Sequence, residues 1–167
     1  MCFIPLLIQE RKKMNTYLIS VRKPHTDFMR TGAKRIEWRK SQLPFGEYFI
    51  YETITSGGGG MIIGKATIRT VSFYEKCFDV PAYAIDRGCV SRRFLYDYVG
   101  KEPIYGHELS NVVIFKNPRP LSEFCKPCEG NCLLCTMHAK ALNAPPQSWC
   151  RVIDSKKNKI ERKEITN

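Results

Sequence analysis

The feature that most limits the fold is a series of alternating or β-branched stretches, which are typical of strands, with a single helix placed early among them. These stretches predict strands at residues 16–22, 34–40, 46–53 and 61–75. A helix is predicted at 23–32, because a proline suits its first turn and a glycine suits its end. Parallel α/β folds need helices that alternate regularly with strands, and this pattern lacks them. The sequence therefore predicts an α+β domain built on a small mixed sheet that curls into a barrel.

The second half of the chain adds short helices and two more strands. Residues 78–99 are predicted to form two short helices separated by a glycine, and residues 107–120 and 147–153 to form strands. No repeat period is present. A chain of 167 residues with this pattern is expected to form one domain with a core of its own.

Composition and charge set the boundaries of this domain. We place it at residues 14–154, with an N-terminal extension at 1–13, a cysteine-rich insertion at 125–138 and a basic C-terminal tail at 155–167. The formal net charge is +11, and the domain stays basic when both ends are set aside. A basic body favours polyanionic partners, nucleic acid among them.

The N-terminus gives no sign of export. A short apolar run precedes a basic cluster there, which is the opposite order to a secretory signal. No apolar run reaches the roughly eighteen residues that a membrane span needs. We therefore expect a cytoplasmic protein without a membrane partner, whose eight cysteines are reduced thiols or metal ligands.

The strongest local motif is a cluster of four cysteines in two CxxC units. Two such units can each grip one side of a tetrahedral ion. We expect a structural zinc ion bound by Cys125, Cys128, Cys132 and Cys135. A ligand exchange with His138 or Cys150, an iron–sulfur cluster and free thiols remain alternatives. A closed all-cysteine site leaves no open position for chemistry, so the metal would staple the insertion and take no part in a reaction.

The predicted strand at 34–40 carries an unusual polar face. Its apolar residues fall on one face, and the other face places Glu37 beside Arg39, directly after Lys34. These three charges cannot be buried without pairing, since an unpaired buried charge costs several kcal/mol. A carboxylate between two cations would fix their directions and leave donors for a phosphate or a base edge. The alternative is a structural ion pair on a solvated face.

Other polar and aromatic residues are less informative. His25 and His107 have no carboxylate or metal partner near them in the sequence, so neither is assigned a role. The tyrosines and phenylalanines at 45–51 and 94–105 are mostly core candidates, although some of them could stack on bases. No Cys/His or Ser/His/Asp arrangement typical of a nucleophilic triad is present, which argues against an enzyme.

The motif Gly32-x-Lys34-x-x-Glu37-x-Arg39 resembles the signature of the ASCH domain family, a branch of the PUA-like β-barrels. It follows a strand and a helix, as in that family. The segments FGEYFIYET, MIIGKATIRTV and LSNVVIFKNPRPLSEF are similar to the family's later strands, and APPQSWCRV to a closing strand of its phage-type members. The resemblance covers residues 15–153 apart from the cysteine-rich insertion, and indicates a phage or bacterial type of member.

This resemblance implies a small β-barrel whose cleft binds RNA or another nucleic acid, or a modified nucleotide. Lys34 and Arg39 would contact phosphate or base, and Glu37 would orient them. Lys23 would extend the basic rim, and the opposite wall would be formed by Ser148 and Trp149.

Two other functions follow from the same residues. Some small bacterial members are hydrolases of RNA or of acylated cytidine and use the motif lysine. In that alternative Lys34 would polarise or attack the substrate, and Glu37 would transfer protons. The amidohydrolase members carry a threonine near the position of Glu37, which this chain lacks. The third hypothesis depends on the cysteine cluster and is an adaptor, stabilised by zinc, whose partner is another protein.

Overall fold

A computed structural model describes residues 15–127 and 140–156 of the chain. Its elements are β1 (Thr16–Val21), α1 (Lys23–Arg30), β2 (Ile36–Arg39), β3 (Gly46–Glu52), η1 (Ile54–Ser56), β4 (Ile62–Tyr74), η2 (Cys77–Asp79), α2 (Ala82–Gly88), α3 (Arg92–Val99), β5 (Ile104–Arg119), η3 (Leu121–Glu123), β6 (Phe124–Lys126), β7 (Lys140–Ala141), β8 (Trp149–Arg151) and β9 (Ile153–Asp154). Each predicted strand and helix has a counterpart within a few residues of its expected place, whereas the short strands β6 and β7 were not predicted.

The main sheet has six strands in the order β2-β5-β4-β3-β1-β8. β1 pairs with β3 in parallel, and the other neighbours are antiparallel. A parallel pair needs a crossover connection, which α1 and β2 provide here. The sheet curls into a half-barrel, with β2 and β8 as its two edges. The predicted α+β class and curled mixed sheet are thus confirmed.

The predicted closing strand is divided between two sheets. β8 pairs with β1 in the main sheet, whereas β9 pairs with β6 in a smaller sheet of order β7-β6-β9. Arg119, at the end of β5, connects this smaller sheet to the main sheet. Its guanidinium makes two hydrogen bonds of 2.7 Å to Asp154 and one of 2.7 Å to Glu123. It also lies over the ring of Phe124, 4.5 Å from the centroid.

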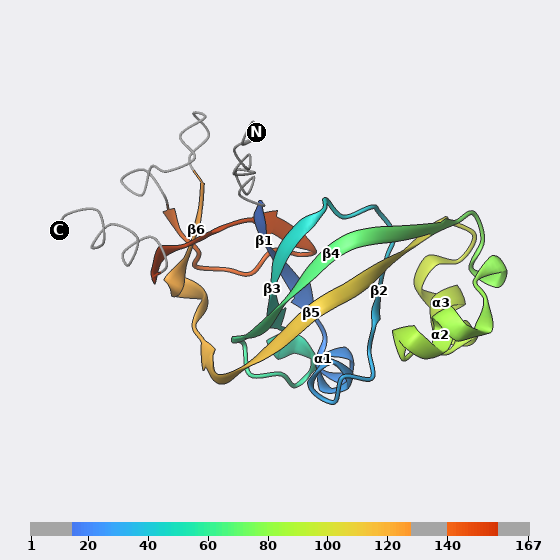
Figure 1. Cartoon of the computed structure of the whole chain (residues 1–167), viewed down its shortest axis with the longest axis horizontal. Coiled ribbons are helices and arrows are strands. Elements are labelled where there is room, and N and C mark those ends of the chain that lie inside the picture. Colours follow the sequence, from blue (N-terminus) through green and yellow to red (C-terminus); the bar gives the residue numbers. More distant parts are fainter. Residues whose placement is uncertain (1–14, 128–139, 157–167) are drawn as a thin grey trace, which may run out of the picture.

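Long β4 and β5 carry α2 and α3 at the end that lies away from β6 (Figure 1). A hydrophobic cluster joins these helices to the sheet through Trp38 of β2. The indole ring has glycines around it. A Cβ added to Gly88 would come within 2.0 Å of the indole nitrogen, and one added to Gly106 within 2.8 Å of the ring. Both positions therefore need glycine for close packing, and α2 is held against β2.

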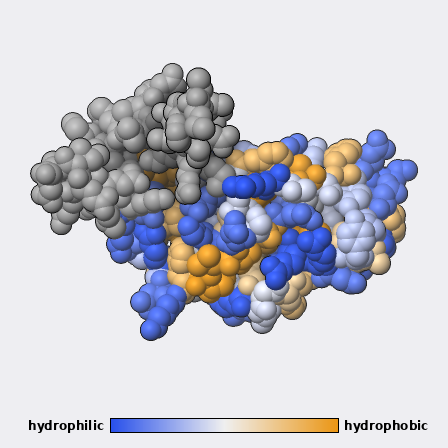
Figure 2. Space-filling model, viewed as in Figure 1, coloured by the Kyte–Doolittle hydropathy of each residue, from blue (hydrophilic) through white to orange (hydrophobic). Residues whose placement is uncertain are grey.

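The face shown in Figure 2 is largely hydrophilic, with an apolar area near its centre. Among the helices of the described residues, none has the length and apolar character to cross a membrane.

Candidate functional site

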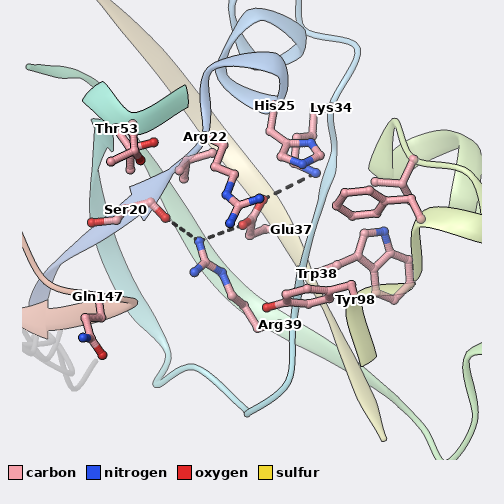
Figure 3. Close-up of a pocket in the computed structure, with 14 residues that line it drawn as sticks. Ser20, Arg22, His25, Lys34, Glu37, Trp38, Arg39, Thr53, Tyr98 and Gln147 are labelled. Atoms are coloured by element: carbon pink, nitrogen blue, oxygen red, sulfur yellow. Dashed lines mark hydrogen bonds and ion pairs between the residues drawn. The ribbon is translucent and has the colours of Figure 1, made fainter. Parts of the chain in front are cut away.

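A pocket of about 330 Å³ lies where β1, α1, β2 and α3 approach one another. Cations, aromatic rings and hydroxyl groups from segments far apart in the sequence face one another across it (Figure 3). The pocket is lined by Ser20, Val21, Arg22, His25, Lys34, Glu37, Trp38, Arg39, Thr53, Thr55, Val90, Phe94, Tyr98 and Gln147.

Lys34, Glu37 and Arg39 form a continuous charge network in this pocket. The Lys34 Nζ lies 3.4 Å from Glu37 Oε2, and Glu37 Oε1 lies 2.8 Å from Arg39 Nη2. Lys34 also donates to the carbonyl oxygen of Gly88 at 2.7 Å. Arg39 donates to the carbonyl oxygen of Ser20 at 2.7 Å and so spans the opening between β2 and β1. The polar face of the charged strand is thus the wall of a pocket.

The charge network is largely buried. The side chains of Lys34 and Glu37 are only 1% and 7% exposed. Burial lowers the pKa of Lys34, and the attraction of Glu37 offsets this only in part. Burial alone would raise the pKa of Glu37, but the charges of Lys34 and Arg39 outweigh it and lower that pKa below the ordinary value. Glu37 is therefore held as a carboxylate between two cations.

The local fold explains how these charges come to be buried. α1 ends in a turn at Gly32, which has a φ of +74° and can adopt this left-handed conformation without a steric penalty. The amide of Lys34 then donates to the carbonyl oxygen of Phe28, and the amide of Arg35 to that of Arg87. The segment before β2 is therefore pinned between α1 and the end of α2, which directs the Lys34 side chain inward.

His107 fixes the backbone of β2 from behind. Its Nε2 accepts a hydrogen bond from the Leu43 amide at 2.9 Å, so its Nδ1 is the atom that carries the proton. That Nδ1 lies 3.2 Å from the carbonyl oxygen of Glu37 and donates to it. Burial lowers the pKa of His107, which agrees with a neutral ring. His107 therefore positions Glu37 and does not reach the pocket itself.

An aromatic wall lies opposite this charge network, on α3. Phe94 and Tyr98 stand one helical turn apart, with ring centroids 6.2 Å apart and planes 16° apart. The ring of His25 meets Phe94 edge-on at 5.4 Å, and the Lys40 ammonium lies 5.2 Å from the Tyr98 centroid. The pocket thus combines flat apolar surface with positive charge.

Arg22 supplies a third cation, and it differs from the other two. It lines the pocket and its guanidinium is directed into it (Figure 3). Its side chain is exposed, and within the described part of the chain it makes no ion pair or hydrogen bond. Arg22 is therefore free to bind an anion, whereas Lys34 and Arg39 are already paired with Glu37.

Unsatisfied buried polar atoms also gather here. Over residues 15–127 and 140–156, three buried side-chain nitrogens lack a hydrogen-bond partner: His25 Nδ1, Trp38 Nε1 and Arg39 Nε. All three residues line the pocket. Such groups are rare in folded proteins and gather where a ligand or a functional role accounts for them. Trp38 Nε1 is packed against Gly88. His25 and Arg39 are the stronger candidates for contacting a ligand.

The structure places the residues predicted for the site in different ways. Lys34, Glu37 and Arg39 come together in the pocket. Ser148 lies beside it, where its hydroxyl accepts a hydrogen bond of 3.4 Å from Arg39. Lys23 is paired with Asp27 at 3.3 Å outside the lining. Trp149 packs edge-on against Tyr17 at the margin of the core, and Gln147, two residues earlier, lines the pocket instead.

Arg22 and His25 line the pocket although neither had a predicted role, whereas Phe94 and Tyr98 belong to the aromatic residues at 94–105, some of which were expected to stack on bases. A signal for this aromatic pair was present, because Phe94 and Tyr98 are four residues apart and therefore share one face of a helix. Arg22 directly precedes the predicted Lys23, and His25 follows it by two residues. Which of these neighbouring side chains turns inward depends on the start of α1.

The predicted zinc ligands lie mostly outside the described residues. Of the four, Cys125 is described: it lies in β6 as a free thiol, and Cys128, Cys132 and Cys135 fall in the segment that the structure does not describe. Across the described ranges no cluster of three or more His, Cys, Asp or Glu side chains could hold a metal ion. The zinc site stays a prediction.

Comparison with known proteins identifies similar folds only among solved structures. No family model and no curated protein matches the sequence. Among solved structures, the chain is similar to ASCH from Zymomonas mobilis at 18% identity and a TM-score of 0.66, over 88% of this chain and 94% of that one. Two point mutants of that protein match at 17% and 19% identity, each with a TM-score of 0.64, over 90% and 89% of this chain and 96% and 97% of theirs. The chain therefore has the fold of the ASCH domain proteins.

Proposed function

We propose that the chain binds nucleic acid, RNA or a modified nucleotide within it, in the basic pocket beside β2. The observation that carries this proposal is the buried network of Lys34, Glu37 and Arg39 at a pocket walled by Phe94 and Tyr98. Three cations face one carboxylate there, so the pocket favours an anionic ligand. Flat aromatic rings beside positive charge are the combination by which proteins hold single-stranded nucleic acid.

The contacts of the three cations indicate different roles, one in positioning and two in ligand binding. Lys34 is buried, donates a hydrogen bond to the carbonyl oxygen of Gly88 and forms an ion pair with Glu37, so it is a positioning residue. Arg39 is fixed by Glu37 but keeps its Nε free of any partner in the described residues. Arg22 has no ion pair there. Arg22 and Arg39 are therefore the residues that contact the ligand.

The test is binding of a fluorescent single-stranded RNA at several salt concentrations. Affinity should fall as salt rises, because each neutralised phosphate releases counterions. Arg22→Gln should weaken binding and reduce the salt slope by about one unit, as expected for one phosphate contact. Arg93→Gln is the matched control, since Arg93 lies on α3, is 82% exposed and pairs with Asp97. Affinity that is independent of salt, or equal losses in both variants, would contradict the proposal.

A hydrolase is the second candidate, favoured by one observation. Lys34 lines the pocket next to a carboxylate, and burial lowers its pKa, which brings an amine closer to the state that can attack or accept a proton. The discriminating experiment offers the protein RNA and acylated cytidine without added metal. We expect no turnover. Cleavage that disappears in Lys34→Arg would favour the hydrolase, because a guanidinium stays protonated.

A further inference from the structure

We infer that the pocket takes a single nucleotide, with its base stacked on Phe94 and Tyr98 and its phosphate bound by Arg22. This inference rests on the proposed function and names the ligand of the same site. It states that the base is bound as well as the phosphate, whereas the proposed function alone would also allow binding through phosphates only.

The aromatic wall has the geometry of a stacking surface. Phe94 and Tyr98 project from one face of α3, and their planes differ by only 16°. Phe94 is 39% exposed although it borders the pocket. A base laid against these rings would bury apolar surface that the protein itself leaves uncovered, and stacking of this kind contributes about 1–3 kcal/mol per base.

The wall is also rigid. Leu95, between the two rings in sequence, is fully buried and anchors α3 in the hydrophobic cluster of the helical segment. His25 supports Phe94 edge-on, and the Lys40 ammonium lies near the face of Tyr98. The N-terminus of α3 is capped by Ser91, whose hydroxyl accepts a hydrogen bond from the Phe94 amide at 3.0 Å. A wall fixed in this way loses little conformational entropy when a ring binds to it.

Arg22 gives the ligand its second point of attachment. It directly follows β1, on the other side of the pocket from α3, and within the described residues its guanidinium makes no ion pair. A guanidinium binds phosphate through two parallel hydrogen bonds, which fixes orientation as well as charge. A ligand that stacks on the aromatic wall and also pairs with Arg22 must have a flat ring and an anionic group.

The size of the pocket limits the ligand to one such unit. Its volume of about 330 Å³ lies at the lower end of the range for small-molecule sites. A ribose phosphate alone would leave the wall uncovered, and several stacked bases would exceed the space. A nucleotide, free or at an accessible position of a strand, matches both limits.

The test is an NMR titration of the full-length protein with UMP, CMP, AMP and GMP, with ribose 5-phosphate and inorganic phosphate as ligands without a base. At least one nucleotide should bind about tenfold more tightly than ribose 5-phosphate, which corresponds to the lower half of the stacking range. Phe94→Leu and Tyr98→Leu should remove most of that difference and leave the affinity for ribose 5-phosphate unchanged. Arg22→Gln should weaken binding of every phosphate-bearing ligand.

Tyr96→Leu is the matched control. Tyr96 lies on the same helix, is 41% exposed and packs against Phe78 outside the pocket lining, so its replacement should change nothing. Equal affinities for the nucleotides and ribose 5-phosphate, or nucleotide binding unaffected by both wall variants, would overturn the inference. In that case salt-dependent RNA binding that requires Arg22 would still support the proposed function. A wild-type protein that binds no RNA would refute the proposed function and this inference together.

Discussion

The ammonium group of Lys34 lies 2.7 Å from the carbonyl oxygen of Gly88, so the charged strand is tied directly to the last residue of α2. The same ammonium faces Glu37 at 3.4 Å. One buried side chain therefore connects the charge network on one side of the pocket with the helical segment that carries the aromatic wall. Because both contacts are buried, a substitution at Gly88 or at Glu37 should alter the position of the Lys34 side chain in the pocket.

Gly88→Ala should destabilise the protein by about 1–3 kcal/mol, the usual cost of forcing extra volume into a packed core. The added Cβ would come within 2.0 Å of the Trp38 indole nitrogen. Urea unfolding measures the change. Gly59→Ala is the control, because a Cβ there meets nothing closer than 3.7 Å. A neutral Gly88→Ala would show that α2 can move away from β2 without cost.

Glu37→Gln should cost about 3–5 kcal/mol of stability, as for other buried ion pairs that lose one partner. The substitution keeps the shape but leaves Lys34 and Arg39 buried without a countercharge. Glu108→Gln provides the comparison, because the Glu108–Arg87 pair is exposed at 3.1 Å and should contribute less than about 1 kcal/mol. Similar losses in the two variants would mean that the network in the pocket is solvated.

Protonation of Glu52 at low pH should lower the free energy of unfolding. Burial alone would raise the pKa of this carboxyl, but hydrogen bonds from Arg30, Thr26 and the Gly59 amide lower it from 4.5 to about 2. A carboxyl whose pKa is depressed by folding stabilises the native state above its unfolded pKa. That stability, about 3 kcal/mol, is lost as the pH falls from about 5 towards 2. Unfolding free energies measured across this range should be less steep in Glu52→Gln, and an unchanged slope would contradict the assignment.

For the cysteine-rich insertion we propose one structural zinc ion per chain, bound by Cys125, Cys128, Cys132 and Cys135. Thiolates in two CxxC units are the donors that zinc prefers. Elemental analysis of freshly purified protein that has never met a chelator should find zinc, and Cys128→Ser should lower both zinc content and stability. Protein without zinc or iron would refute the metal site, whereas iron would indicate a cluster.

The sequence predicted most of the elements and the charge network but not the whole pocket. Strand alternation placed Glu37 and Arg39 on one face, and the need to pair buried charges predicted their contact with Lys34. The phase of a short strand is harder to predict, because one residue of shift exchanges its faces. Trp149 was expected at the pocket, yet it packs on Tyr17.

The aromatic wall shows a second limit of sequence reasoning. Phe94 and Tyr98 are four residues apart, so they share one face of a helix. The spacing does not predict which part of the protein that face contacts. Their position in the same pocket as residues of β1 and β2 depends on how far β4 and β5 extend and on the docking of α2 against Trp38. Such long-range contacts arise from tertiary packing, and no local pattern encodes them.

The most direct test of the account locates RNA on the protein. Single-stranded RNA containing 4-thiouridine is cross-linked to the full-length chain by light, and the modified peptides are identified by mass spectrometry. The account predicts cross-links in the segments that form the pocket, at 20–39 and 90–98. Cross-links confined to the basic ends, at 1–13 or 155–167, would contradict it, because the RNA would then be held by unspecific charge and not by the pocket.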